Sequence, residues 1–201
     1  MDISDAGRPG GPRVSLCVFC GVSGGRTPRY ARAADELGEL IARRGHRLVY
    51  GAGGIGLMGA LAHGAARHRG DILGVIPKFL RAREMGDELP RQQVWLTEDL
   101  LERKRVMIDR SDAFIALPGG YGTLDEVLEV ISMAALGLPV GPLVLVDVDD
   151  DWRVFTTLVE DLFRRDFTRR TDLFQRAATP AEALDLAEAG LAPGLAATTT
   201  G

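Results

Sequence analysis

Short apolar runs alternate with longer helix-like segments along most of the chain, and this alternation restricts the fold more than any other feature. Strands that alternate with helices build a parallel sheet covered by helices on both faces. We therefore predict an α/β fold with a Rossmann-like, doubly wound parallel sheet. The runs expected to form its strands are 14–20, 47–51, 71–76, 92–96, 112–118 and 142–148.

The length of 201 residues suits one domain. We expect a single Rossmann-like nucleotide-binding domain over 14–189. The Gly/Pro-rich segment 1–13 and the tail 190–201 are expected to be disordered. Residues 78–91 look polar and irregular, and 173–177 is read as a short segment between the last two helices.

Composition argues against several classes of partner. The net charge of −4 and the pI of about 5.4 disfavour nucleic-acid binding, which needs a basic excess. We expect no membrane span, because no apolar run approaches the roughly 18 residues that a span needs. The first residues also lack the apolar centre of a signal peptide, so a cytoplasmic location is expected.

Neither cofactor nor metal is expected from the sequence. Cys17 and Cys20 lie inside an apolar strand pattern, where free cysteines usually act as small buried hydrophobes. His63 and His68 are five residues apart, which misses the i, i+4 spacing that places two metal ligands on one helix face. The sequence also contains neither a Walker A motif nor a G-x-S-x-G nucleophile elbow.

Three glycine-rich turns follow three of the expected strands, at 20–25, 51–59 and 118–123. Carboxyl ends of parallel strands meet at one sheet edge, where ligands bind. Glycines there expose backbone N–H groups, and the following helix adds a partial positive charge, so a phosphate is the expected guest. The alternative is that these glycines only make tight turns. The candidate phosphate or ribose ligands in these turns are Gly21, Ser23, Gly53, Gly54, Gly119, Gly120, Gly122 and Thr123.

Residues 51–56 also satisfy the dinucleotide pattern G-x-G-x-x-G. That pattern requires an acidic residue at the end of the next strand to bind the ribose. The next strand ends at Ile76 and Pro77 without one, so NAD binding is disfavoured.

Two acids follow the third turn. Thr123 and Glu126 form T-x-x-E, which can be a helix capping box in which Glu126 holds only the backbone. The other interpretation places Glu126 and Glu129, one turn later on the same face, beside the ligand. Because phosphate repels carboxylate, such acids suit sugar hydroxyls or a water molecule.

An arginine upstream is the second candidate for chemistry. Arg103, Lys104 and Arg105 are consecutive, and such a run usually lies on a solvated surface. Arg103 nevertheless shares an apolar helix stripe with Leu100 and Met107, where a cation needs an anionic partner.

These residues resemble the LONELY GUY (LOG) family of cytokinin-activating phosphoribohydrolases, over about 14–188. The family signature P-G-G-x-G-T-x-x-E is matched from Pro118 to Glu126, and its Arg-Lys pair by Arg103 and Lys104. The segments "VFCG", "VYGAGGIGLMG" and "GVIP" match further parts of the family pattern.

The resemblance implies a homodimer that hydrolyses the N-glycosidic bond of an N6-modified AMP, releasing the free base and ribose 5-phosphate. It assigns catalysis to Arg103 and Glu126, and Lys104 and Glu129 are further candidates for binding the phosphate or ribose. Members often carry a lysine decarboxylase label, which the sequence does not support because it has only two lysines and no recognisable pyridoxal-phosphate motif. Two alternatives stay open: a nucleosidase for AMP or another nucleoside monophosphate, and a non-catalytic binder of a nucleotide or phosphorylated cofactor.

The chain departs from the family pattern at three places. Ala52 replaces a glycine, and its methyl group is expected to narrow the approach to the phosphate. Val22 replaces a frequent serine, which removes a hydroxyl donor, although Ser23 remains. The region 137–151 lacks a longer segment with a tyrosine pair, which affects the inferred base preference and assembly.

Overall fold

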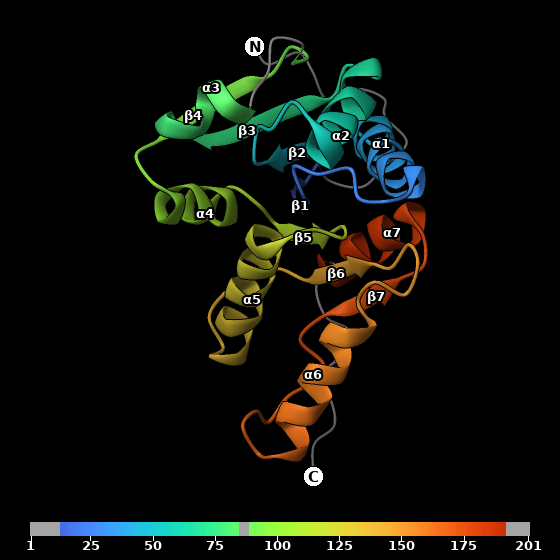
Figure 1. The fold of residues 1–201 in the computed structure, drawn as a ribbon, viewed down its shortest axis with the longest axis vertical. Helices are drawn as coiled ribbons and strands as arrows, with labels where there is room; N and C mark the ends of the chain where they lie inside the picture. The colour runs from blue at the N-terminus through green and yellow to red at the C-terminus, as the bar shows by residue number, and fades with distance from the viewer. Residues whose placement is uncertain (1–12, 85–88, 192–201) are drawn as a thin grey trace, which may run out of the picture.

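The computed structural model describes residues 13–84 and 89–191, and its strands form one seven-stranded parallel sheet (Figure 1). The strand order is β4-β3-β2-β1-β5-β6-β7, which confirms the predicted α/β class. The strands are β1 (Ser15–Phe19), β2 (Arg47–Tyr50), β3 (Asp71–Pro77), β4 (Gln93–Thr97), β5 (Ala113–Ala116), β6 (Leu143–Val146) and β7 (Gln175–Ala177).

Helices cover both faces of this sheet. Buried side chains of α1, α2 and α7 pack on one face, and those of α4, α5 and the start of α6 pack on the other. The helices are α1 (Pro28–Arg43), α2 (Gly56–Arg67), α3 (Arg81–Glu84), α4 (Leu100–Asp109), α5 (Tyr121–Ala135), α6 (Arg153–Arg164) and α7 (Pro180–Leu191), with a 3-10 turn, η1 (Lys78–Leu80).

Local signals in the sequence account for the ends of α1. Thr27 is the N-cap, and its hydroxyl accepts a hydrogen bond from the backbone N–H of Arg29. Pro28 begins the helix, where its missing N–H costs nothing. Gly45 follows the helix in the left-handed region, at φ +79°, which glycine adopts without strain.

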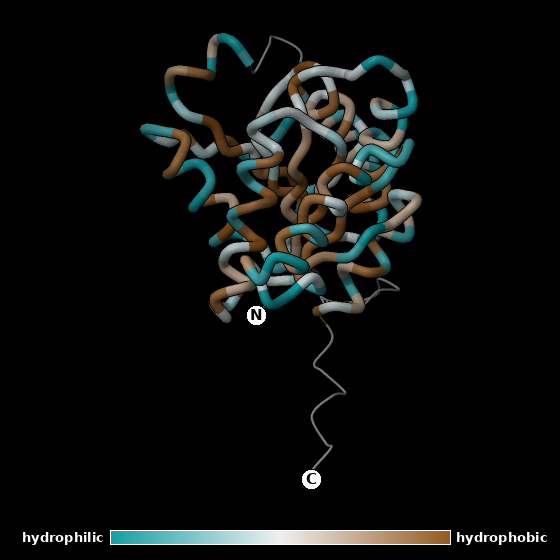
Figure 2. Tube along the Cα trace, turned by 60° about the horizontal axis from the view of Figure 1, so that its bottom comes forward, coloured by the Kyte–Doolittle hydropathy of each residue, from teal (hydrophilic) through white to brown (hydrophobic). Residues whose placement is uncertain are grey.

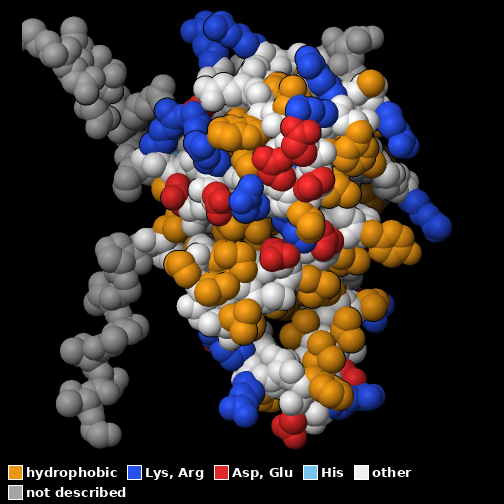
Figure 3. Space-filling view, turned by 90° about the vertical axis from the view of Figure 1, so that its left-hand side faces the viewer, with side chains coloured by type: hydrophobic (Ala, Val, Ile, Leu, Met, Phe, Trp, Pro, Cys, Tyr) orange, Lys and Arg blue, Asp and Glu red, His pale blue; other side chains and the backbone are white. Residues whose placement is uncertain are grey.

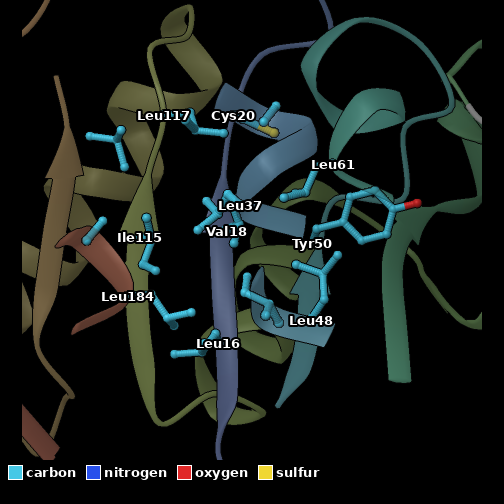
Figure 4. Close-up of a cluster of buried hydrophobic side chains, with 14 of the residues drawn as sticks. Leu16, Val18, Cys20, Leu37, Leu48, Tyr50, Leu61, Ile115, Leu117 and Leu184 are labelled. Carbon is cyan, nitrogen blue, oxygen red and sulfur yellow. The ribbon is translucent and has the colours of Figure 1, made fainter. Parts of the chain in front are cut away.

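The central strand β1 divides its side chains between two cores. Leu16 and Val18 join the cluster under α1, α2 and α7 (Figure 4), whereas Cys17 and Phe19 join the cluster on the opposite face. Figure 2 shows the hydrophobic residues concentrated in the interior. Cys17 and Cys20 are free and buried, as predicted.

Two expectations from the sequence need correction. The two terminal segments that were expected to be disordered lie mostly outside the described residues. The segment 78–91 is not wholly irregular, because it contains η1 and α3. The seventh strand, β7, was missed because only one of its three residues is buried, which leaves no apolar pattern. Of the segments 1–13 and 190–201, the structure describes only Arg13 and the end of α7, which reaches Leu191.

The chain reverses direction across the sheet between β1 and β5. From β1 it continues through α1 to β2 on one side, and it returns through α4 to β5 on the other side. The connections leaving the carboxyl ends of these neighbouring strands therefore diverge to opposite faces. A crevice at such a switch point is the usual ligand site of a doubly wound sheet.

Ala52 occupies an unusual backbone position beside β3. It lies at φ +56°, a left-handed conformation that disfavours residues other than glycine, and it is fully buried. A methyl group added to Gly74 would lie 2.7 Å from the Ala52 Cβ and 2.8 Å from Gln92 Oε1. The Ala52 methyl group therefore packs against β3 beside Gly74.

This packing predicts a coupled pair of substitutions. Gly74→Ala should destabilise the protein by about 1–3 kcal/mol, the usual cost of overpacking. Adding Ala52→Gly should recover part of that loss, because it removes the nearest obstruction. Urea denaturation of both single variants and the double variant measures the coupling.

Gly24→Ala is the control, because an added Cβ there meets nothing within 4 Å. Strictly additive effects of the two substitutions would show that the contact between residues 52 and 74 does not limit this site.

Candidate active site

The three glycine-rich turns meet at the carboxyl edge of the sheet, as predicted. An added Cβ on Gly21 would lie 3.5 Å from the Gly119 Cα, so the turns after β1 and β5 touch through their backbones. An added Cβ on Gly56 would lie 2.1 Å from the Val22 carbonyl oxygen, so the turn after β2 also adjoins the first turn. A side chain at Gly56 would therefore force the first two turns apart, whereas a Cβ on Gly21 would make an ordinary van der Waals contact.

A cleft of about 480 Å³ lies between the turns after β1 and β5. It contains four of the predicted ligand residues, Gly21, Ser23, Gly119 and Gly120. It is also lined by Val22, Gly25, Arg26, Tyr30, Leu57, Pro118 and Asp151.

The structure does not bring Gly53 and Gly54 into this cleft. Gly53 is buried, and a Cβ there would lie 2.8 Å from the Met58 Cε. The N–H of Gly54 donates to the backbone carbonyl of Glu84 at 2.6 Å. This part of the turn after β2 therefore packs against α2 and bonds to the end of α3 instead of lining the cleft.

The start of α5 presents backbone donors to the same edge. Its N-cap is Gly120, which supplies no side chain, and the N–H of Leu124 bonds to the Gly120 carbonyl at 3.1 Å. The N–H groups that precede Leu124 in the helix, including those of Gly122 and Thr123, have no intrahelical acceptor. Such a terminus attracts anions.

Thr123 and Glu126 do not form the capping box that the T-x-x-E spacing allowed. The cap is Gly120, no side chain caps the helix, and Thr123 already lies inside the first turn. Thr123 is buried, and a Cβ on Gly119 would lie 2.1 Å from its hydroxyl oxygen. Glu126 is thus available for another role.

Glu126 is partly exposed, and no hydrogen bond within the described residues engages its carboxylate. Burial raises the pKa of this carboxyl from 4.5 to about 7. The positive charge of Arg103 opposes that shift in pKa, Asp125 adds to it, and Lys104 opposes it weakly. A carboxyl group with a pKa near 7 can accept or donate a proton at neutral pH.

Arg103 reaches the same edge from α4. Its Nη2 donates to the carbonyl oxygen of Gly51 at 2.7 Å, and its buried Nε has no partner among the described residues. A Cβ on Gly51 would lie 1.9 Å from that Nη2, so only glycine leaves room for the bond. Arg103 was expected to have an anionic partner, because it lies on an apolar helix stripe, but its partner is a neutral carbonyl. Glu126 is close enough for the positive charge of Arg103 to lower its pKa.

Lys104 and Glu129 are joined to each other. The Lys104 Nζ lies 3.0 Å from the Asp125 carboxylate and 2.9 Å from the Glu129 carboxylate. Its side chain is only 11% exposed, and these acids raise its pKa against the opposing effect of burial. This bridge between α4 and α5 fixes the helices that carry Arg103 and Glu126.

Three residues of the cleft were missed at the level of sequence. Arg26 and Tyr30 directly follow the first glycine turn, so their proximity to that turn was a usable signal. Asp151 lies 121 residues after Tyr30, and only the fold shows that its carboxylate accepts a hydrogen bond from the Tyr30 hydroxyl.

Within the described ranges, no three His, Cys, Asp or Glu side chains are arranged to hold a metal ion. In the same part of the chain, no helix has the length and apolar character needed to cross a bilayer.

A switch-point crevice with glycine turns and an open helix N-terminus defines a class of α/β protein suited to phosphorylated ligands. A family model described as "Possible lysine decarboxylase" matches residues 58–187. The chain belongs to this family, the LOG family, as the sequence resemblance predicted.

Curated relatives carry phosphoribohydrolase names. The chain is 46% identical over 145 residues to the rice (Oryza sativa subsp. japonica) cytokinin riboside 5'-monophosphate phosphoribohydrolase LOG, covering 72% of this chain and 60% of that protein. The Arabidopsis thaliana protein LOG7, with the same enzyme name, is 45% identical over 148 residues, covering 72% and 66%. The matched segment thus spans less than two thirds of either relative.

Solved structures share the fold. A molybdenum cofactor binding protein from Rippkaea orientalis superposes with a TM-score of 0.66 at 23% identity, covering 89% of this chain and 97% of that one. A Moco carrier protein from Chlamydomonas reinhardtii gives a TM-score of 0.65 at 22% identity, covering 90% and 99%.

The raised pKa of Glu126 predicts a pH-dependent difference in stability. The folded protein retains the Glu126 proton to a higher pH than the unfolded chain, so ionisation destabilises the fold as pH rises from 4.5 through about 7. Glu126→Gln removes this cost. Relative to wild type, the variant should therefore gain on the order of 3 kcal/mol across that range, at about 1.36 kcal/mol per pKa unit.

Urea denaturation of both proteins at several pH values measures this difference. All other ionisable groups are the same in the two proteins, so their contributions to the pH dependence of unfolding cancel in the difference. A difference in unfolding free energy that stays constant from pH 4.5 to above 7 would contradict the raised pKa.

Proposed function

We propose that this protein hydrolyses the N-glycosidic bond of a nucleoside 5'-monophosphate such as a cytokinin riboside 5'-monophosphate. The products are the free base and ribose 5-phosphate. The names of the curated relatives support this reaction. The observation that carries it is the unpaired Glu126, with its pKa near 7, within the electrostatic influence of Arg103 and on the helix that begins at the glycine turn after β5.

The 5'-phosphate is assigned to the turn at Gly119 and Gly120 and to the free N–H groups at the start of α5. Backbone donors and the helix dipole favour an anion there without any cationic side chain. Glu126 lies about one and a half turns after the start of the same helix. We therefore expect that a ligand whose phosphate binds at the helix start places its ribose near Glu126.

Glu126 and Arg103 take complementary parts in the reaction. Water adds across the C1'–N9 bond: the hydroxyl group bonds to C1', and the proton goes to the departing base. The ionised Glu126 orients this water, accepts its proton and stabilises the positive charge that develops on the sugar. The proton then passes from Glu126 to the departing base, which restores the carboxylate. The Arg103 guanidinium binds the nucleotide and orients the base.

The two side chains can be tested by measuring release of free base. Glu126→Gln and Arg103→Ala should each lower kcat for isopentenyl-AMP by about 10²–10⁴, the usual range for acid–base and electrostatic catalysis. Glu36→Gln is the control for Glu126, because it makes the same chemical change at an exposed residue of α1 that forms no ion pair within the described residues, and it should leave kcat nearly unchanged. Chromatography quantifies the base.

A substrate panel of isopentenyl-AMP, AMP and the unphosphorylated riboside distinguishes the alternatives. We expect isopentenyl-AMP to be cleaved fastest and the riboside very slowly. Preference for AMP would indicate a different nucleosidase. Tight binding without base release would indicate a non-catalytic nucleotide carrier, and a folded Glu126→Gln variant with full activity would contradict the catalytic assignment.

We further propose a homodimer, as the resemblance implies, with α5 and α6 in its interface. No residue of α6 is fully buried, and Figure 3 shows hydrophobic side chains gathered on the face that includes α5. Exposed apolar residues on or near these helices are Leu128, Leu136, Leu138, Val154, Leu158, Leu162, Phe163 and Phe167. The cytoplasmic location stays a prediction from sequence.

Sedimentation velocity tests this assembly. Wild type should sediment at twice the chain mass of 21.6 kDa, and Leu136→Glu combined with Leu158→Glu should shift it to a single chain. Phe79→Glu, at an exposed apolar residue in η1, should leave the dimer intact. A monomeric wild type would contradict the proposal.

A further inference from the structure

Lys104 lies between the two helices that carry the proposed catalytic residues. It leaves α4 directly after Arg103, and its ammonium group reaches α5, the helix that carries Glu126 (Figure 1). Its side chain is nearly buried, and a buried cation is costly unless acids neutralise it. The contacts of this ammonium group therefore show what the fold uses it for.

The Lys104 ammonium group joins two acids that lie on either side of Glu126 along α5. Its Nζ is 3.0 Å from both carboxylate oxygens of Asp125 and 2.9 Å from the Glu129 carboxylate. Asp125 directly precedes Glu126, and Glu129 follows one turn later on the same helix face. Asp125 and Glu129 are four residues apart, a spacing at which like charges on a helix repel each other. One cation removes this repulsion.

Lys104 stays positively charged through the neutral pH range. Burial alone would lower its pKa, but the hydrogen bonds to Glu129 and Asp125 outweigh burial, and the pKa is raised. Both acids are more exposed than the lysine between them. Lys104 is thus a fixed positive charge and takes no part in proton transfer.

Glu126 is sensitive to the charges of this cluster. Burial raises its pKa to about 7, Arg103 lowers this pKa, Asp125 raises it and Lys104 lowers it. The thiols of β1 and its end stay neutral, because burial raises their pKa values. The charged and titratable groups around Glu126 are Arg103 and Lys104 of α4, Asp125 and Glu129 of α5, and the thiols Cys17 and Cys20.

We propose that Lys104 is a positioning residue that keeps Glu126 ionised at neutral pH by neutralising Asp125 and Glu129. This inference rests on the proposed function for the role of Glu126 as the base. Without the ammonium group, two uncompensated carboxylates would lie beside Glu126, and like charges favour its protonated form. A protonated carboxyl group cannot accept a proton from water, so the loss of Lys104 would remove the base without touching it.

NMR titration of the Glu126 carboxyl carbon tests this inference without any substrate. Glu126→Gln identifies the signal by its absence. Lys104→Met replaces the ammonium group with an apolar side chain of similar length, and it should raise the Glu126 pKa by about 0.5–1 pH unit. Lys104→Arg keeps the charge and should leave this pKa close to that of wild type.

Two further variants predict responses that a loss of packing would not produce. Asp125→Asn removes an exposed like charge and leaves Lys104 in place, so the Glu126 pKa should fall. Lys104→Met combined with Asp125→Asn restores the net charge of the wild-type cluster, so the pKa should return toward the wild-type value. Lys78→Met is the matched control, because it removes an exposed lysine that pairs with Glu98 and should leave the pKa unchanged.

The pH dependence of kcat for isopentenyl-AMP is the kinetic test. In Lys104→Met the acid limb should move to higher pH by the same amount, since kcat follows the ionised fraction of the base. At about pH 6, kcat should therefore fall roughly 3–10-fold relative to its value at high pH, compared with wild type. A purely structural defect would lower kcat by the same factor at every pH.

The inference is overturned if folded Lys104→Met leaves the Glu126 pKa unchanged, if Lys78→Met shifts it equally, or if Asp125→Asn raises it. Asp125→Asn changes an exposed residue, so it gives this test even where Lys104→Met does not fold. The expected pKa shifts in a wild-type protein that releases no base from any nucleotide would overturn the proposed hydrolysis alone. Base release that depends on Glu126, without the pKa shifts, would overturn this inference alone.

Discussion

The backbone contact between the turns after β1 and β5 is the constraint on which the site depends. Two chain segments that leave neighbouring strands for opposite faces meet there at Gly21 and Gly119, with no side chain between them. Strand β1 is buried between the two hydrophobic cores, and this packing fixes its position next to β5. The cleft exists because the segments diverge, and the backbone of Gly21, Gly119 and Gly120 forms part of its lining.

Charge pairing around this cleft determines which groups remain available. Lys104 satisfies two acids of α5, and Arg29 and Arg176 satisfy acids of the loop after β6. Glu126, Arg103, Arg26 and Asp151 are left without an ion-pair partner within the described residues. Such unpaired charged groups at this edge are candidates for contacts with a ligand.

The sequence was sufficient for the sheet, the three glycine turns and the family, because these depend on local periodicity and glycine placement. It missed β7, which has almost no apolar pattern, and it left the role of Thr123 and Glu126 open. It also expected Gly53 at the ligand, where the fold buries it. Contacts such as Tyr30 with Asp151 join segments far apart in the chain, so no local pattern indicates them.

The bond from Arg103 to the Gly51 carbonyl has a consequence for how this family can diverge. The acceptor is main chain, so every amino acid at position 51 would offer the same oxygen, and only the bulk beside it varies. Position 51 is therefore restricted to glycine for as long as Arg103 keeps this bond, because a side chain there would occupy the position of the Nη2. An arginine anchored in this way depends on the small size of its neighbour and not on any functional group that the neighbour carries.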